Sequence, residues 1–205
     1  MPNVEHQVLA HVPADDGRVK PQGYAHVVLL STRAEELIDW YCGIVGLQLV
    51  MRSEVINFLT FDHSQDRLAI IATRQAIAQA GTTGLDHIAL EYRSLQDLVA
   101  IYHRAGERGL RPHWCVNHGI ATSMYFHDPD GRSIECSVGH FPTRDAVNAW
   151  LSTGEFNRNP IGVTLSAADL VRRVESGEEE REILRPHPLH GASLEAELRR
   201  MGSER

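Results

Sequence analysis

Two stretches of the chain, Gly23-Tyr24-Ala25-His26-Val27 and Gly84-Leu85-Asp86-His87-Ile88, decide the fold, because each opens the same succession of patterns. A run of strand-forming residues is followed by a helical pattern and then by three short strands separated by polar turns. The first unit predicts a helix at 34–44 and strands at 24–30, 47–52, 56–61 and 67–72. The second predicts a helix at 95–108 and strands at 85–92, 111–116, 121–127 and 132–138. A β-α-β-β-β unit that occurs twice indicates duplication, with the two units packed about a local two-fold axis.

One such unit has too few strands to close a core alone. The predicted fold class is therefore α+β, with the two repeats forming a barrel-like curled mixed sheet around a shared cavity. Residues 1–22 are expected to form an N-terminal arm, 23–74 the first module and 84–140 the second, the two modules making one domain. Helical patterns at 143–151, 166–175 and 193–201 predict a helical C-terminal extension over 141–205. The charge run at 178–182 is typical of a solvated surface.

Composition and charge exclude several classes of protein. The 205 residues are 42% hydrophobic and 23% charged, which suffices for a packed core. No apolar run approaches the roughly 20 residues of a membrane span, and a net charge of −7 without a basic stripe argues against a nucleic-acid partner. Three cysteines without a CxxC spacing, and no visible secretory signal, predict reduced thiols in the cytoplasm. We therefore expect a cytoplasmic protein that acts on a small molecule.

The candidate metal ligands are His26, His87 and Glu135. A single histidine in an apolar strand is more often a core residue, but two at equivalent repeat positions are brought together by the two-fold axis. Glu135 lies in a strand whose polar and apolar residues alternate, which fits either a solvent-exposed face or a wet cavity inside a curled sheet. Two imidazoles and one carboxylate are the facial ligand set of non-haem Fe(II) oxygenases, and Mn(II), Zn(II) and Ni(II) use the same ligands. The shared cavity is thus predicted to be a metal cavity.

The turn Asp128-Pro129-Asp130-Gly131 decides which residues face each other across the last two strands. Proline followed by a left-handed glycine predicts a three-residue loop with a G1 bulge. This register places Tyr125 opposite Glu135, with Cβ atoms about 5 Å apart. When Arg67 is aligned with Arg132, Ile70 takes the place of Glu135 in the first repeat, so a fourth protein ligand is not expected.

These residues resemble a known family, the vicinal oxygen chelate superfamily. The resemblance rests on the paired units, the two histidines, and Tyr125 followed by the turn at 128–131 and Glu135. With Trp114-Cys115-Val116-Asn117-His118-Gly119 added, the chain is most similar to the one-domain type I extradiol dioxygenases, from about residue 23 to 141. A weaker similarity continues through Phe141-Pro142-Thr143 and Asn159-Pro160-Ile161-Gly162.

The resemblance implies a chemistry and roles for individual residues. His26, His87 and Glu135 would bind Fe(II), and a small catechol-like aromatic diol and O2 would be the substrates of a ring cleavage beside the diol. Tyr125 would hydrogen-bond the metal-bound substrate oxygen. His118 is the nearest acid–base candidate, with a pKa suited to neutral pH. Asn117 is expected to orient His118 or the substrate, and Trp114 to form a wall against the ring.

The chain departs from its apparent relatives at one point. Similar sequences carry a His-His pair before the last strand of the first repeat, and its second histidine is the catalytic base. Here those positions are Gln65-Asp66, so the base would be either Asp66 or His63, which lies in the same turn and is also a candidate for binding the substrate. Two other functions stay open: a non-catalytic small-molecule-binding protein on the same fold, and a glyoxalase-like metal-dependent lyase or isomerase. A homodimer or higher homo-oligomer is expected in each case.

Overall fold

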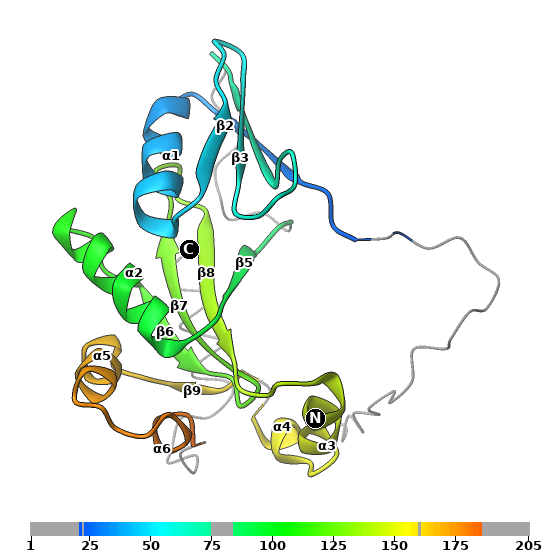
Figure 1. The fold of residues 1–205 in the computed structure, drawn as a ribbon, viewed down its shortest axis with the longest axis vertical. Coiled ribbons are helices and arrows are strands. Elements are labelled where there is room, and N and C mark those ends of the chain that lie inside the picture. The colour runs from blue at the N-terminus through cyan, green and yellow to red at the C-terminus, as the bar shows by residue number, and fades with distance from the viewer. Residues whose placement is uncertain (1–20, 22, 75–83, 160, 186–205) are drawn as a thin grey trace.

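The computed structural model describes residues 21, 23–74, 84–159 and 161–185, and it contains two β-α-β-β-β units in succession (Figure 1). The first unit forms a four-stranded sheet, sheet A, in the order β1-β4-β3-β2. β1 and β4 are parallel and the other neighbours antiparallel. Its elements are β1 (Val27–Ser31), α1 (Ala34–Trp40), the π-helix η1 (Tyr41–Val45), β2 (Gln48–Met51), β3 (Ile56–Thr60) and β4 (Leu68–Ala72).

The second unit forms a five-stranded sheet, sheet B, in the order β5-β8-β7-β6-β9. Its helix begins at a capping box, in which Ser94 and Asp97 each accept a hydrogen bond from the other's backbone N–H. Its edge strand β9 comes from the C-terminal extension. The elements are β5 (His87–Tyr92), α2 (Leu95–Glu107), β6 (Trp114–Asn117), β7 (Ala121–His127), β8 (Ser133–Gly139) and β9 (Val163–Thr164).

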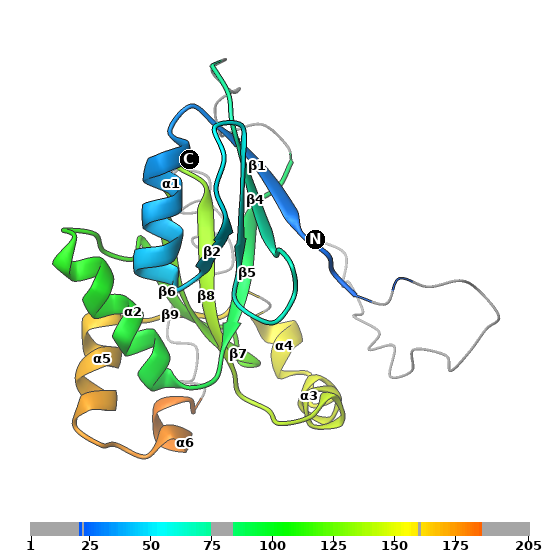
Figure 2. The same ribbon diagram turned by 45° about the horizontal axis from the view of Figure 1, so that its top comes forward.

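One hydrophobic core joins both units. It lies between helices α1 and α2, which stand on one side of the strands, and the apolar faces of the two sheets (Figure 2). Burial of this kind of aliphatic and aromatic surface is the main favourable contribution to folding. Side chains with almost no exposed surface include Leu37, Ile44, Leu98, Ile101, Phe126 and Ile134.

The turn between β7 and β8 has the predicted geometry. The Asp128 N–H donates to the Arg132 carbonyl at 2.9 Å, and Gly131 has a φ of +83°, a left-handed conformation that glycine adopts without a Cβ clash. The turn also connects the two units. The Arg132 guanidinium donates to the Leu30 carbonyl at 2.7 Å, and the Tyr41 hydroxyl donates to the Asp128 carboxylate at 3.3 Å.

The strand registers correct the alignment of the two repeats. Val27 lies beside Leu68 in sheet A, as Ile88 lies beside Ile134 in sheet B. The residue equivalent to Glu135 is therefore Ala69, one position before the predicted Ile70. The error arose because the alignment was anchored on two arginines, whereas the hydrogen-bonded ladder fixes which side chains share a face.

The C-terminal extension contains α3 (Arg144–Leu151), α4 (Glu155–Arg158), α5 (Ala167–Glu175) and α6 (Glu180–Ile183), besides β9. The helices predicted at 143–151 and 166–175 are confirmed, with Thr143 and Ser166 as their N-caps. The one predicted at 193–201, and the arm apart from Pro21, lie outside the described residues. Leu170, Val174 and Ile183 are buried in the common core, so α5 and α6 extend the helix layer beside α2 (Figure 2).

The predicted α+β class is confirmed, with one difference in the arrangement of the strands. The structure has two separate mixed sheets, and these are not closed into a barrel. None of the helices in the described ranges is both long enough and apolar enough to cross a bilayer.

Candidate functional site

Sheet B carries a group of polar side chains on the face opposite its apolar core face. The predicted bulged register is confirmed: Tyr125 lies opposite Glu135 in the β7–β8 pair. His87 shares this face, because Ala89, two residues further along β5, lies beside Glu135 in the parallel pair. Tyr125 is 5% exposed and Glu135 8%. The face is therefore buried around Tyr125 and Glu135, whereas it is exposed at Ala89 of the neighbouring strand β5.

Glu135 is the centre of this group. One of its carboxylate oxygens lies 2.9 Å from Nε2 of His87, and the other accepts a hydrogen bond from the Ser123 hydroxyl at 2.6 Å. Burial raises the pKa of Glu135, but the hydrogen bonds from His87 and Ser123 lower it by more, so the net shift is downward. The carboxylate is thus ionised at neutral pH, as a metal ligand must be.

The geometry of His87 suits a metal ligand. Its Nδ1 lies 2.8 Å from a carboxylate oxygen of Asp86, which leaves Nε2 directed at Glu135. Carboxylates commonly hold the second nitrogen of metal-binding histidines in this way. Two donor atoms bound at right angles to one ion, each about 2.1 Å from it, lie about 3.0 Å apart. The observed 2.9 Å between Nε2 and Oε2 is that of a hydrogen bond, and it is also compatible with this spacing.

Tyr125 connects Glu135 to His118. Its hydroxyl lies 3.1 Å from Nε2 of His118, and its ring stacks on Trp114 with the centroids 4.9 Å apart. Burial and, secondly, the charge of Glu135 raise the pKa of Tyr125 well above its usual value. The phenol therefore stays protonated at neutral pH and acts as a hydrogen-bond donor.

His118 follows the last residue of β6. Its Nδ1 lies 2.6 Å from the carbonyl oxygen of Ile161, and its Nε2 lies 3.9 Å from Glu135. Burial lowers the pKa of this imidazole, although the Ile161 carbonyl and the Glu135 charge act in the opposite direction. A neutral ring that donates from Nδ1 has a free lone pair on Nε2, so His118 is placed to accept a proton beside the Tyr125 hydroxyl.

His26 lies elsewhere in the structure. It precedes β1, its side chain is 45% exposed, and its Nδ1 is 3.0 Å from a carboxylate oxygen of Asp66. Among the described residues, no group of three His, Cys, Asp or Glu side chains is arranged to hold a metal ion. His26 thus does not join His87 and Glu135 in such a group. The two histidines lie at the starts of strands in different sheets, which no strand pairing connects.

The remaining predicted site residues have different surroundings. Asn117 is buried, and its amide donates to the Leu184 carbonyl at 3.0 Å and accepts from the Gly119 N–H at 2.7 Å. Trp114 forms a wall behind the Tyr125 ring and donates from Nε1 to the Thr164 hydroxyl at 3.1 Å. His63 is exposed in the turn between β3 and β4. Asn117 therefore binds the backbone at Leu184 and Gly119. Trp114 contacts the site through the Tyr125 ring.

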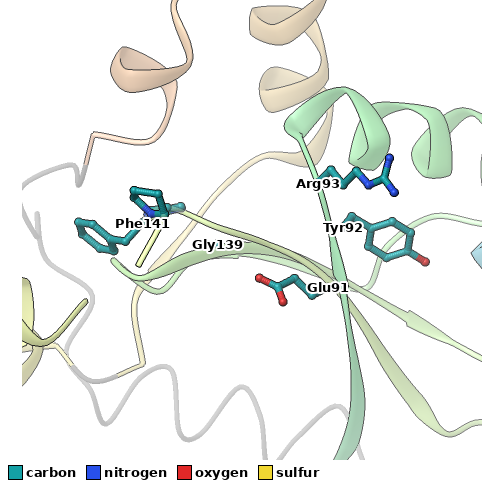
Figure 3. Close-up of a pocket in the computed structure, with 7 residues that line it drawn as sticks. Glu91, Tyr92, Arg93, Gly139 and Phe141 are labelled. Carbon is teal, nitrogen blue, oxygen red and sulfur yellow. The ribbon is translucent and has the colours of Figure 1, made fainter. Parts of the chain in front are cut away.

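A hollow of about 600 Å³ lies at the other ends of β5 and β8 (Figure 3). Figure 3 shows Glu91 and Tyr92 leaving β5 on opposite sides. The hollow is open to solvent and contains none of the predicted site residues. The group around Glu135 is the better candidate, because groups with shifted pKa values meet there. The hollow is lined by Glu91, Tyr92, Arg93, Gly139, His140, Phe141 and Pro142.

Three contributors to this site were absent from the predicted set. Ser123 lies two residues before Tyr125 on the same strand, so the alternation alone placed it on the polar face. Asp86 directly precedes His87, and a carboxylate beside a candidate ligand is a recognisable signal. The Ile161 carbonyl is a backbone group from the extension, and no side-chain pattern points to it.

Comparison with known proteins identifies the family of this chain. A family model described as the Glyoxalase/Bleomycin resistance protein/Dioxygenase superfamily matches residues 23–136. Biphenyl-2,3-diol 1,2-dioxygenase 2 of Rhodococcus globerulus is 31% identical over 156 residues, which cover 75% of this chain and 82% of the relative. Biphenyl-2,3-diol 1,2-dioxygenase 3 of the same organism is 28% identical over 162 residues, covering 78% and 85%.

Solved structures agree on the fold alone. A glyoxylase/bleomycin resistance protein/dioxygenase domain from Frankia sp. EAN1pec superposes with a TM-score of 0.53 at 16% identity, over 62% of this chain and 99% of that one. A glyoxalase/dioxygenase from Nostoc punctiforme gives 0.52 at 16% identity, over 62% and 100%.

Proposed function

Since this chain belongs to the glyoxalase/bleomycin resistance protein/dioxygenase superfamily, we propose that it is an extradiol-type dioxygenase that uses Fe(II) and O2 to cleave a catechol-like aromatic ring. The observation that carries the proposal is the position of the Tyr125 hydroxyl, 3.1 Å from Nε2 of His118, on a residue that lies directly opposite Glu135. The names of the two Rhodococcus relatives support a vicinal aromatic diol as the substrate class.

His87 and Glu135 would hold the ion, and His26 would complete the set that the family resemblance implies. When bound, Fe(II) would bring diol and O2 together and make the diol more acidic. Each histidine has a carboxylate on Nδ1, Asp66 for His26 and Asp86 for His87, so Nε2 of each is left as the ligand atom. This pairing supports Asp66 as a residue that orients His26, and not as the base.

The protein's own acid–base chemistry would then fall to His118 and Tyr125. Nε2 of His118 is placed to take a proton from one hydroxyl of the diol, because this nitrogen has a free lone pair and little solvent around it. The Tyr125 hydroxyl would donate a hydrogen bond to the substrate oxygen that becomes negative. Trp114 stacks on the Tyr125 ring and thereby limits the positions that this ring can take.

The test is anaerobic reconstitution of the full chain with Fe(II), followed by metal quantification and by oxygen uptake with a panel of catechols that includes biphenyl-2,3-diol. We expect one iron per chain and oxygen consumption with formation of a coloured ring-fission product. Glu135→Ala should abolish both, whereas Ser137→Ala, on the same face of β8, should leave both unchanged.

Two outcomes would count against the proposal. Stoichiometric metal without oxygen uptake for any catechol would favour a lyase, an isomerase or another metal-assisted reaction. No retained metal in the wild-type chain, with tight binding of a catechol, would favour a binding protein without turnover.

A further inference from the structure

Residues of the C-terminal extension cross the end of β6 directly beside His118. We call Asn159 and residues 161–164 the strap. Its start is a tight turn: the Asn159 side-chain oxygen accepts from the backbone N–H of Ile161 at 3.3 Å and of Gly162 at 3.1 Å, and its amide donates to the Gly162 carbonyl. An asparagine that folds onto its own backbone in this way fixes the direction of the peptide groups that follow.

The end of the strap is bound to the same strand that leads to His118. β9 pairs with β6, with Val163 opposite Asn117 and Thr164 opposite Val116. The Thr164 hydroxyl accepts from the Trp114 indole at 3.1 Å. The strap is therefore fixed both by its own turn and by a strand pair.

Gly162 allows the strap to lie against the backbone of β6. A Cβ at this position would overlap the Asn117 carbonyl oxygen and would lie 2.8 Å from Cα of His118. Both are backbone atoms, which cannot turn aside as the end of a flexible side chain can. Gly162 also has a φ of +104°, where side chains are rarely found. Any other residue would push the strap away from His118.

This close approach brings the Ile161 carbonyl oxygen within 2.6 Å of Nδ1 of His118. A carbonyl oxygen only accepts hydrogen bonds, so the proton of the neutral imidazole must be on Nδ1. Nε2 then carries the lone pair, and it faces the Tyr125 hydroxyl at 3.1 Å. Without the carbonyl, the ring has no acceptor on the Nδ1 side, and the other tautomer, whose Nε2–H the Tyr125 hydroxyl oxygen can accept, becomes accessible.

We propose that the strap is a positioning element for His118: the Ile161 carbonyl holds the ring in its Nδ1–H tautomer, and Gly162 is the specific residue that permits this contact. The tautomer follows from the geometry alone. Its consequence for catalysis rests on the proposed function, in which Nε2 of His118 takes the substrate proton.

The test compares Gly162→Ala with Gly154→Ala in the full, metal-free chain. Gly154 also has a positive φ, +79°, but a Cβ there would have nothing within 4 Å. Both variants therefore place an alanine at a positive φ, and only Gly162→Ala displaces the strap. Asn159→Ala removes the turn without adding an atom, and it serves as a second variant if Gly162→Ala does not fold.

The readout is the histidine tautomer, measured by two-bond ¹H–¹⁵N correlation spectra of histidine-labelled protein at pH 8, with the His118 signals identified from a His118→Asn sample. We expect Nδ1–H for His118 in the wild type and in Gly154→Ala. In Gly162→Ala and Asn159→Ala we expect a mixture of the Nδ1–H and Nε2–H tautomers of His118, or the Nε2–H tautomer alone. An Nε2–H tautomer in the wild type, or an unchanged Nδ1–H tautomer in both strap variants, would overturn the proposal.

Activity of the reconstituted enzyme gives an independent second result. If the strap positions the base, kcat should fall about 10–100-fold in the strap variants while KM changes little, because orientation and proton transfer are lost but substrate binding is not. Should the wild type cleave no catechol and still show the Nδ1–H tautomer, the proposed function fails and the positioning role stands. Should kcat stay at the wild-type value in strap variants whose tautomer has changed, the catalytic consequence is wrong.

Discussion

Replacing Ser123 by alanine tests whether the buried carboxylate of Glu135 is stabilised as the structure indicates. Ser123 has no exposed surface, and its hydroxyl donates to Glu135 at 2.6 Å. A hydrogen bond to a charged group contributes about 1.5–3 kcal/mol to stability. Since His87 remains on the other carboxylate oxygen at 2.9 Å, we expect a loss of about 2 kcal/mol. With an m-value of about 2 kcal/mol per molar urea, the unfolding midpoint should fall by about 1 M.

The size of this loss should depend on pH. Burial raises the pKa of Glu135, but the hydrogen bonds from His87 and Ser123 lower it by more, so the native pKa lies below that of the unfolded chain. Such a carboxyl stabilises the fold above its unfolded pKa, about 4.3, and loses this contribution as the pH falls through the native value. Ser123→Ala moves the native pKa back toward the unfolded one. The difference between wild type and variant is therefore largest at pH 7 and shrinks below about pH 4.

The assay is urea unfolding of the metal-free protein at several values between pH 7 and pH 3.5. Ser137→Ala is the matched control, because Ser137 lies directly opposite Ser123 on the same face of sheet B and is more exposed. Its stability should change by less than about 0.5 kcal/mol. An equal loss for the two serine variants, or a loss for Ser123→Ala that is the same at pH 7 and pH 3.5, would refute the reasoning about Glu135.

Three further predictions concern single positions. Asp66→Asn should weaken metal binding about 10–100-fold in a chelator competition, because His26 loses the carboxylate on Nδ1; its urea midpoint should stay near that of the wild type, since the pair is partly exposed. Gly131→Ala should cost about 1–2 kcal/mol in urea unfolding, from its φ of +83° alone, as a Cβ there would meet nothing within 4 Å. Ser94→Ala should cost about 1 kcal/mol in the same assay by removing the N-cap of α2, and a smaller loss on Ser94→Thr would confirm the cap.

The features that the sequence predicts correctly are those that depend on local geometry. The turn at 128–131 fixes the register of β7 and β8, because a proline and a left-handed glycine permit few loop conformations. The period-two alternation then places Tyr125 and Glu135 on one face. Ser94 marks the start of α2, because its hydroxyl satisfies a backbone N–H that the helix leaves free.

The features that the sequence does not predict depend on contacts between distant segments. The pairing of His26 with Asp66 joins β1 to the turn before β4, and the Ile161 carbonyl reaches His118 from 43 residues further along the chain. A carbonyl group is present at every position, so the sequence carries no mark of the one that is used. The separation of the strands into two sheets is also not predicted, because packing between distant segments decides it and no local turn or repeat specifies it.

Among the described residues the polar group around Glu135 lies on sheet B alone, although the two sheets come from the same repeat. Ala69 occupies the place of Glu135 in sheet A, and its strand neighbours are Val28 and Phe58, whereas Glu135 lies between Ala89 and Tyr125. A buried carboxylate persists only where donors surround it, since an unpaired charge is expensive to desolvate. In sheet B, His87 and Ser123 supply these donors, one on each oxygen of Glu135. The repeat therefore predicts the same backbone twice. The chemistry at Ala69 and Glu135 differs because different side chains surround these two equivalent positions.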